Sequence, residues 1–282
     1  MEAEIQDFWQ KNPCGAWLVG DLTAEERRAY EEFFVRYDEY RYAKEPHILT
    51  NLDKIDFQGK RVLEIGLGQG ADGEAIVKRG GVYSGVDLTD ESVKRVKMRF
   101  ELRSLAYETI EQASALELPF EDGSFDIVFS HGVLHHIPEI QKASAEIARV
   151  LRPDGELVSM FYAKRSLNYL VSIAILRRLG LLVFYVTGVK KDGMIDEHLK
   201  NAKRSGIWKY LSLKNFVNAN TDGPRNPYSK VYDLDRVRED FPEFYIVKSY
   251  QSFMHAPPLN VRWLPLEKSL GWHLWVHMRS KV

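Results

Sequence analysis

Hydrophobic and polar positions alternate along the central part of the chain in two rhythms. Between residues 61 and 162, short apolar runs typical of buried strands take turns with longer segments in which apolar residues recur every three or four positions. The runs expected as strands are 61–65, 82–86, 108–113, 125–130 and 156–162, and the segments expected as helices are 71–79, 90–103 and 139–151. Apolar strands separated by amphipathic helices indicate a parallel sheet covered on both faces, so the pattern predicts a doubly wound α/β domain.

The segment before this domain is mixed, aromatic and charged. Its residues 23–42 place apolar side chains at helical spacing, and Thr23 and Glu26 are expected to form a capping box at the start of the helix. We therefore expect residues 1–60 to form an N-terminal helical lid.

The strand–helix rhythm stops after residue 164. Residues 166–189 are strongly apolar, but Arg177 and Arg178 stand near their centre, where charges make a membrane span costly. The pattern favours two short helices packed on the domain and no membrane span. It leaves open a peripheral contact between lipid and the apolar face of these helices.

Strand-like patterns return near the end of the chain, at residues 245–250 and 272–278. Together with the five earlier strands, they predict a mostly parallel sheet of seven strands. The domain is expected to run from 61 to 282, with residues 164–230 as an inserted cap that is rich in apolar and aromatic side chains.

Composition narrows the classes of function. The 282 residues include 39 Lys and Arg against 40 Asp and Glu, a net charge of −1, which gives no support to a non-specific binder of nucleic acid. Cys14 is the single cysteine, which excludes a disulfide within the chain and a metal site built from several cysteines. The first ten residues lack the basic and apolar regions of a secretory signal, so we expect a cytoplasmic protein. No oligomeric state is predicted.

The most informative stretch is VLEIGLGQGADG at residues 62–73. An expected strand ends at residue 65, and glycines follow at positions 66, 68, 70 and 73. An expected helix starts at residue 71, within this glycine run. Glycines let the backbone turn sharply and approach a ligand, while the N–H groups of the helix start point at it. Asp87 ends the next strand about twenty residues further on, where a carboxylate can accept both hydroxyls of a ribose. This combination predicts a nucleotide-type cofactor.

The residue before the glycines separates two kinds of cofactor. Residues 68–73 match the G-x-G-x-x-G pattern of dinucleotide sites, which by itself is weak evidence for a nicotinamide-dependent oxidoreductase. The run begins earlier, at Gly66, and gives the pattern E-x-G-x-G-x-G with Glu64 on the strand. A carboxylate there would repel a pyrophosphate, but through bridging water it suits the cationic amino-acid end of another cofactor. In this pattern the sequence resembles the class I S-adenosylmethionine-dependent methyltransferases, and within them the type 11 group that includes ubiquinone/menaquinone-biosynthesis enzymes.

Two further segments carry the resemblance. Residues 114–139 resemble the family's adenine-side loop, fourth strand and following turn, and residues 146–158 resemble the next helix and the fifth strand. The resemblance covers about 61–162 and implies a Rossmann-like fold. One position departs from the family pattern, because Ser114 stands where an acid usually holds the adenine amino group, and a hydroxyl accepts a hydrogen bond more weakly than a carboxylate.

The resemblance implies that S-adenosylmethionine lies across the carboxyl ends of the first and fourth strands and leaves as S-adenosylhomocysteine. The residues implied to contact it are Arg41 and Tyr42 from the lid, Glu64, Gly66, Gly68 and Gly70 at its methionine end, Asp87 and Leu88 at its ribose, Ser114 and Ala115 at its adenine, and Ser130 and His131 near its sulfur.

Three histidines follow the fourth strand. His131 is the candidate catalytic base, because histidine titrates near neutrality, whereas the pair His135 and His136 is expected to have a structural or cofactor-positioning role. No Asp, Glu or Cys stands near them at ligand spacing, so no metal is predicted. The candidates for an acceptor pocket are aromatic and basic residues from the cap and the segment after it: Trp208, Tyr228, Lys230, Tyr232 and His255.

These observations predict methyl transfer from S-adenosylmethionine to a small-molecule acceptor by in-line positioning. The apolar, aromatic cap favours a lipophilic or aromatic acceptor. The alternatives are a nicotinamide-dependent oxidoreductase and a non-catalytic S-adenosylmethionine-binding module, to which Ser114 gives slight support. A nucleic-acid methyltransferase is disfavoured, because residues 131–134 read HGVL where base amino-methylation has an Asn/Asp-Pro-Pro-aromatic signature.

Overall fold

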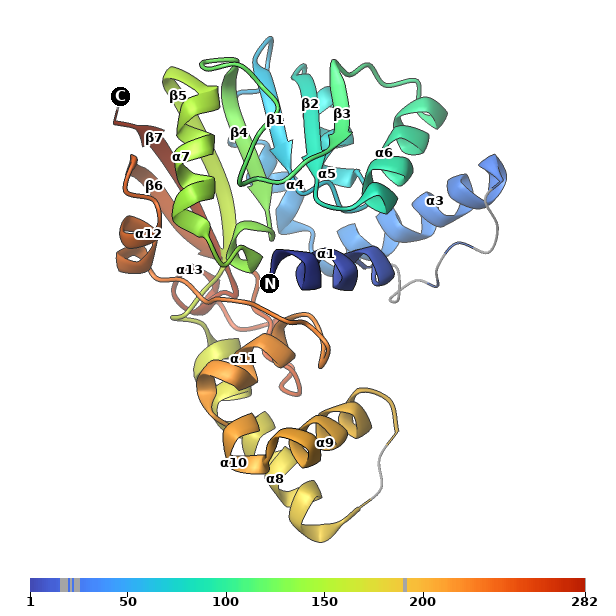
Figure 1. The fold of residues 1–282 in the computed structure, drawn as a ribbon, viewed down its shortest axis with the longest axis vertical. Helices are drawn as coiled ribbons and strands as arrows, with labels where there is room; N and C mark the ends of the chain where they lie inside the picture. The colour runs from blue at the N-terminus through green and yellow to red at the C-terminus, as the bar shows by residue number, and fades with distance from the viewer. Residues whose placement is uncertain (16–19, 21, 23–25, 190–191, 282) are drawn as a thin grey trace.

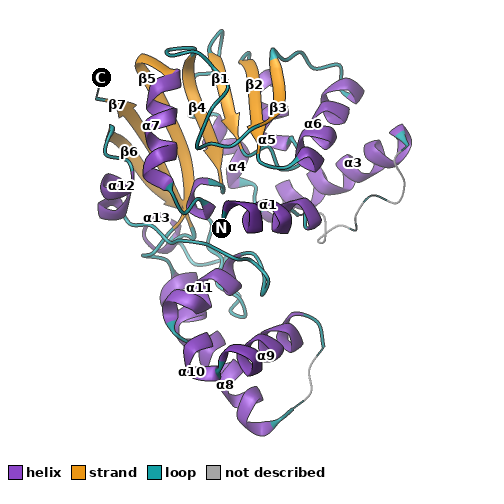
Figure 2. Cartoon of the chain, viewed as in Figure 1, coloured by secondary structure: helices purple, strands orange, loops and turns teal. Residues whose placement is uncertain are grey.

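A sheet of seven strands in the order β3-β2-β1-β4-β5-β7-β6 forms the centre of the molecule in the computed structural model, which describes residues 1–15, 20, 22, 26–189 and 192–281 (Figure 1, Figure 2). The strands are β1 (Arg61–Ile65), β2 (Val82–Asp87), β3 (Thr109–Gln112), β4 (Phe125–His131), β5 (Leu151–Tyr162), β6 (Phe244–Ser252) and β7 (His273–Ser280). The first five are parallel, and β7 runs antiparallel to both β5 and β6. The predicted doubly wound, mostly parallel seven-stranded sheet is confirmed.

Helices cover both faces of this sheet because each presents an apolar side to it. On one face, α4 (His47–Leu52), α5 (Ala71–Lys78) and α6 (Asp90–Leu102) bury aliphatic and aromatic side chains against the strands. On the other face, α7 (Ile140–Val150) and α12 (Leu234–Asp240) do the same. Burial of one such side chain contributes about 1.5–3 kcal/mol, so these two layers hold the strand ends in fixed positions.

The N-terminal region contains two longer helices, α1 (Glu2–Lys11) and α3 (Arg27–Lys44). Glu26 is the N-cap of α3 but makes no side-chain capping bond, and Thr23, its predicted partner in a capping box, lies outside the described residues. Helix α1 was not predicted from the sequence. It lies below the carboxyl ends of the strands, with its N-terminus near the centre of the molecule (Figure 1).

A group of helices extends away from the sheet, at the bottom of Figure 1. We call residues 168–221 the helical lobe. It comprises the π-helical segment η2 (Asn168–Arg177), α8 (Arg178–Thr187), α9 (Met194–Ser205), α10 (Ile207–Tyr210) and α11 (Leu213–Thr221). The apolar core of the lobe includes Ile173, Leu199 and Phe216, and it continues to Phe253 and Trp272 beside the sheet. Two short elements complete the fold, the 3-10 turn η1 (Leu134–His136) after β4 and α13 (Glu267–Leu270) before β7.

The apolar segment 166–189 differs from its prediction as two short helices. Its residues Asn168–Thr187 form one helical stretch of 20 residues, and by length and composition this stretch could cross a bilayer, which is weak evidence for a span. Its two arginines bond within the protein. Arg177 donates to the carbonyls of Pro257 (3.1 Å) and Asn220 (3.0 Å), and Arg178 donates to that of Leu211 (2.8 Å), so the charged centre of the segment is held by the protein.

Candidate functional site

A cavity of about 410 Å³ lies at the carboxyl ends of β1, β2 and β4. Parallel α/β sheets place ligands here because the strand order reverses between β1 and β4 and the loops diverge. The cavity has the size of an ordinary small-molecule site. Its wall is formed by the glycine loop after β1, the end of β2, the turn after β4 and helix α1.

The glycine loop comes close to the cavity because it lacks side chains where the chain turns. Gly66 has a φ of +85°, and a Cβ built there would lie 2.2 Å from Val133 Cγ2. Gly70 has a φ of +77° and begins α5, with the side chains of Val96 and Arg99 only 3.1 Å from the position of a Cβ. Of the predicted glycines, Gly66 and Gly68 line the cavity, whereas Gly70 supports the loop from behind.

Asp87 presents its carboxylate at the end of β2, in the cavity wall. Oδ2 accepts a hydrogen bond from the backbone N–H of Leu67 (2.8 Å), and Oδ1 accepts from the N–H and the hydroxyl of Thr89 (2.9 and 2.8 Å). Burial raises the pKa of the Asp87 carboxyl above its ordinary value, although these hydrogen bonds act in the opposite direction. The carboxylate is thus held in one orientation, beside Leu88.

A second charged group in the wall joins three elements. Asp72, in the first turn of α5, accepts from Arg41 Nη2 (2.9 and 2.7 Å), and its Oδ2 lies 2.7 Å from His131 Nδ1. Burial acts to raise the pKa of Asp72, but Arg41 and His131 outweigh it and hold that pKa well below its ordinary value. The structure therefore places the predicted residues Arg41 and His131 in the cavity wall.

Asp72 was not predicted as a site residue. It stands inside the quoted glycine motif, but an acid in the first turn of a helix is usually explained by the helix dipole. Its hydrogen-bond donor Arg41 lies 31 positions away in the sequence, so no local sequence pattern predicts this bond.

Four predicted cofactor residues lie outside the wall of this cavity, and their contact with a cofactor stays a prediction. Glu64 is buried under the glycine loop, where Tyr83 donates to it and burial raises its pKa well above the ordinary value. Ser130 is fully buried and donates to the carbonyl of Ile65 (2.9 Å). Tyr42 donates to the carbonyl of Ala71 (3.4 Å), and the fourth is Gly70, described above.

Helix α1 covers the side of the cavity at which adenine was expected. Glu2, Ile5 and Trp9 line the wall, and Gln6 Nε2 donates to the carbonyl of Leu88 (2.9 Å). The hydroxyl of Ser114 donates to the carboxylate of Glu2. The chain therefore brings a carboxylate to the position where the family has its acid, but from an element 112 residues away. Ser114 and Ala115 both line the cavity, as predicted.

The structure does not bring the five predicted acceptor residues into this cavity. Trp208 is 75% exposed on α10. Lys230 and Tyr232 both bond to Asp240, and His255 stacks on Phe253 with ring centres 5.0 Å apart. Two of them bond through the backbone to the turn after β4: the carbonyl of Tyr228 accepts from His136 Nδ1 (2.8 Å), and the N–H of Lys230 donates to the carbonyl of His135 (2.9 Å). The side chains of Lys230, Tyr232 and His255 are thus engaged by neighbours, and that of Trp208 faces solvent.

Residues 63–159 match the family model described as "Methyltransferase domain". The chain contains a methyltransferase domain. Over 104 residues, this domain is 35% identical to the fatty-acid O-methyltransferase of Mycolicibacterium smegmatis and to the phthiotriol/phenolphthiotriol dimycocerosates methyltransferase of Mycobacterium tuberculosis. Each match covers 36% of this chain and 37% of the relative, so the chain spans little more than a third of the length of these curated relatives.

Solved structures share the fold of this methyltransferase domain. An S-adenosylmethionine-dependent methyltransferase from Mesorhizobium loti superposes with a TM-score of 0.53 at 16% identity, over 84% of this chain and 97% of that one. The PH0226 protein from Pyrococcus horikoshii OT3 gives 0.53 at 15% identity, over 98% and 99% of the two chains. These likenesses establish a class I methyltransferase fold, as the sequence predicted.

The donors around the cavity fit S-adenosylmethionine, the cofactor of this family. Asp87 offers a fixed carboxylate for ribose hydroxyls, and Ile5 and Leu116 offer apolar wall for a purine. Arg41 and Asp72 offer one charge of each sign to a zwitterionic amino-acid end. The nicotinamide alternative loses its support, because the matched domain is that of a methyltransferase.

Proposed function

We propose that the protein transfers the methyl group of S-adenosylmethionine to a small lipophilic acceptor, and that it does so in the cytoplasm. The observation that carries the proposal is the cavity whose wall contains Asp87, the glycine loop and the ion pair of Arg41 and Asp72. When bound there, S-adenosylmethionine supplies an activated methyl group, so the protein contributes chiefly position.

Different side chains along the cavity bind different parts of the cofactor. Asp87 accepts the ribose hydroxyls, and Glu2 with Ser114 accepts the amino group of the adenine. Arg41 and Asp72 orient the amino-acid end of the cofactor. Arg41 Nη2 lies 2.7 Å from Asp72 Oδ2, so this ion pair fixes both charged side chains. Helix α1 covers the ligand, and Ile5 and Trp9 exclude water from the wall.

His131 is the proposed base for an acceptor that loses a proton. Its Nδ1 lies 2.7 Å from Asp72, so an N–H there donates to the carboxylate and leaves the lone pair on Nε2. Nε2 is buried and has no hydrogen-bond partner among the described residues, so an acceptor reaches it only when the surrounding wall moves. A histidine oriented in this way by a carboxylate can accept a proton, which is the arrangement that a general base requires.

Calorimetric titration with S-adenosylmethionine, S-adenosylhomocysteine and NADH in parallel tests the cofactor. We expect micromolar binding of the first two and none of NADH; binding of NADH alone would reverse the assignment. Transfer of a labelled methyl group to a long-chain fatty acid, supplied as probe, then separates an enzyme from a non-catalytic binding module. A protein that binds the cofactor but methylates neither this probe nor an aromatic phenol would contradict the proposed acceptor class.

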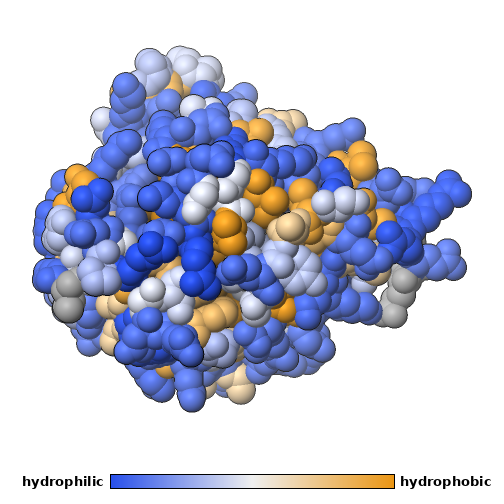
Figure 3. All heavy atoms as spheres, turned by 90° about the horizontal axis from the view of Figure 1, so that it is seen from above, coloured by the Kyte–Doolittle hydropathy of each residue, from blue (hydrophilic) through white to orange (hydrophobic). Residues whose placement is uncertain are grey.

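The helical lobe supports a lipophilic acceptor, because it has the features of a surface that meets anionic lipid. Exposed apolar side chains follow one face of the helical stretch Asn168–Thr187: Leu170, Ile175, Leu179, Val183 and Val186. Residues 164–230 hold 13 Lys and Arg against four Asp and Glu, a charge of +9, which leaves −10 on the rest of the chain. An apolar stripe with surrounding basic residues binds the interface of an anionic bilayer. The opposite end of the molecule is mainly hydrophilic, with apolar residues in small patches (Figure 3).

Flotation with lipid vesicles tests this contact. We expect the protein to float with vesicles of phosphatidylcholine and phosphatidylglycerol, and to float less with phosphatidylcholine alone. The double variant Leu179→Gln/Val183→Gln should lose flotation, whereas Val247→Gln, at a valine that is 52% exposed on β6, should keep it. Flotation that is absent in the unmodified protein, or equal in both variants, would refute a lipid-binding lobe.

A further inference from the structure

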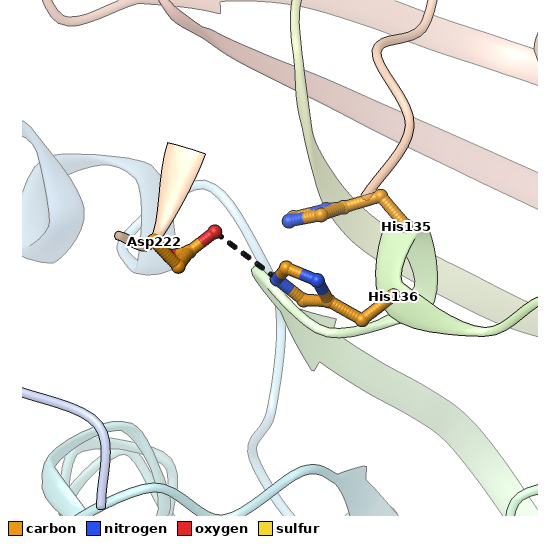
Figure 4. A group of neighbouring side chains, drawn as sticks. All are labelled: His135, His136 and Asp222. Carbon is orange, nitrogen blue, oxygen red and sulfur yellow. Dashed lines mark ion pairs between the residues drawn. The ribbon is translucent and has the colours of Figure 1, made fainter. Parts of the chain in front are cut away.

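Two histidines and one aspartate from distant parts of the chain meet beside the cofactor cavity. His135 and His136 lie in η1, the turn after β4, and Asp222 directly follows α11 of the helical lobe. Each offers one ligand atom, and these atoms lie within 4.8 Å of one another (Figure 4). His136 Nε2 and Asp222 Oδ2 are 3.4 Å apart. The sequence predicted no metal here, because no Asp, Glu or Cys joins the histidines at ligand spacing along the chain.

Neighbouring groups orient all three side chains towards a common point. His136 Nδ1 donates to the carbonyl of Tyr228 (2.8 Å), which leaves the lone pair on Nε2, facing Asp222. Asp222 Oδ1 accepts from the hydroxyl of Tyr162 (2.8 Å), which leaves Oδ2 for a ligand. Bonds of this kind, from the outer atoms of each ligand to the protein, are typical of histidines and carboxylates that hold metals.

Several buried polar atoms of this cluster have no hydrogen-bond partner among the described residues. His135 is fully buried, and neither of its ring nitrogens has a hydrogen-bond partner among the described residues. The Nε2 atom of His136 and the Oδ2 atom of Asp222 are also buried without one. Tyr162 holds the ring of His135 in place, with ring centres 4.1 Å apart, and stacks on Trp272 at 4.6 Å. Unpaired buried polar atoms are rare in native proteins, and several at one point indicate an ion or water that they bind.

We propose that His135, His136 and Asp222 bind one divalent transition-metal ion, with Zn²⁺ as the best match. Two imidazole nitrogens and one carboxylate oxygen are a donor set of zinc sites that keep a fourth position open. Zinc bonds of about 2.0–2.2 Å place tetrahedral ligands roughly 3.3 Å apart, close to the 3.4 Å between His136 and Asp222. His135 reaches the same geometry by a movement of at most about 1.5 Å, given the 4.8 Å limit on all three atoms.

The position of this site gives it two consequences. The ion would connect the end of α11 to the turn after β4, so it would tie the helical lobe to the sheet. Because His136 also lines the cavity, an acceptor oxygen could occupy the open position beside the methyl donor. This second consequence depends on the proposed function, whereas metal binding itself does not.

Calorimetric titration of the chelator-treated full chain with ZnCl₂ tests the site. We expect one ion per chain, and at least a tenfold loss of affinity in Asp222→Asn, which keeps the shape of the side chain and its bond to Tyr162. The matched control is Asp53→Asn, at a carboxylate that is 64% exposed and paired with Arg79, which should bind zinc as the unmodified protein does. No zinc binding, or equal binding by Asp222→Asn, would overturn the proposal.

A second measurement uses the unmodified protein, so it does not require any variant to fold. X-ray absorption of the zinc-loaded protein should show two imidazoles in the first shell, and a shell without imidazole would also overturn the site. Titration of the metal-free chain with S-adenosylmethionine keeps the two proposals apart. Failure of that titration contradicts the proposed cofactor, and failure of the zinc titration contradicts only the metal.

Discussion

Replacement of Asp87 by asparagine tests the cofactor site at its most constrained residue. The carboxylate accepts three hydrogen bonds from Leu67 and Thr89, which orient it without using all of its lone pairs. Asparagine keeps one oxygen, and it is expected to turn that oxygen towards Thr89, which supplies two of the three donors. Its NH₂ group then faces the N–H of Leu67 and can no longer accept a ribose hydroxyl.

Two free energies follow from this geometry. Loss of a hydrogen bond to a charged acceptor should weaken S-adenosylmethionine binding by about 1.5–3 kcal/mol, or roughly 10- to 150-fold in Kd. The unsatisfied N–H of Leu67 should lower the free energy of unfolding by about 1–3 kcal/mol in the absence of cofactor. Alanine would leave all three donors unpaired and would mix the two effects more strongly.

Calorimetry measures the first free energy, and urea unfolding without cofactor measures the second. Asp90→Asn is the matched control, because Asp90 is exposed in the first turn of α6 and lies outside the cavity wall. It should leave the Kd unchanged. An Asp87→Asn protein that binds S-adenosylmethionine with the unmodified Kd would refute the placement of the ribose.

Three further changes test other parts of the structure. Gly66→Ala combines a φ of +85° with a Cβ that would lie 2.2 Å from Val133; it should cost about 2–4 kcal/mol of unfolding free energy in urea denaturation, and an unchanged midpoint would contradict the close approach. Glu2→Gln should weaken S-adenosylmethionine binding by about 0.5–1.5 kcal/mol, because a neutral acceptor replaces a charged one, and unchanged calorimetry would remove α1 from the site. Burial lowers the pKa of His198 to about 4, so the unfolded chain binds more protons there and stability should fall as pH drops from about 6.5 towards 4. Unfolding curves of His198→Gln across this range should show a weaker fall, and an identical fall would exclude His198 as a cause.

The local pattern of apolar residues was sufficient to predict the part of the fold in which strands and helices alternate. Strands β1, β2, β4 and β5 and the helices that cover them were predictable because a strand buried on both faces is a continuous apolar run and a covering helix is periodic. The turn after β1 was predictable too, since positive φ at Gly66 and Gly68 demands glycine. The end of β2 then fixed where Asp87 had to lie. The match to the methyltransferase family model lies within these segments.

The acceptor side was not predictable in the same way. The expected pocket residues Trp208 and Tyr232 have the right chemistry, but one is exposed and the other is buried against Asp240. Whether a polar or aromatic side chain faces a cavity depends on which neighbours satisfy it first, and those neighbours come from elsewhere in the chain. The helical stretch Asn168–Thr187 was predicted as two helices because Arg177 and Arg178 interrupt its apolar pattern. The carbonyls that accept from Arg177 belong to other segments of the chain.

The sequence by itself determined the doubly wound sheet, the glycine loop and the position of Asp87 at the end of β2, because each depends on residues that are close together along the chain. Only the tertiary structure decided that Glu2 meets Ser114, that Asp72 pairs with Arg41, and that Asp222 joins His135 and His136. These pairs are separated by 112, 31 and more than 80 positions, and no periodicity or motif extends over such distances. Packing of the helices on the sheet brings them together, so the chemistry that completes the site depends on the fold.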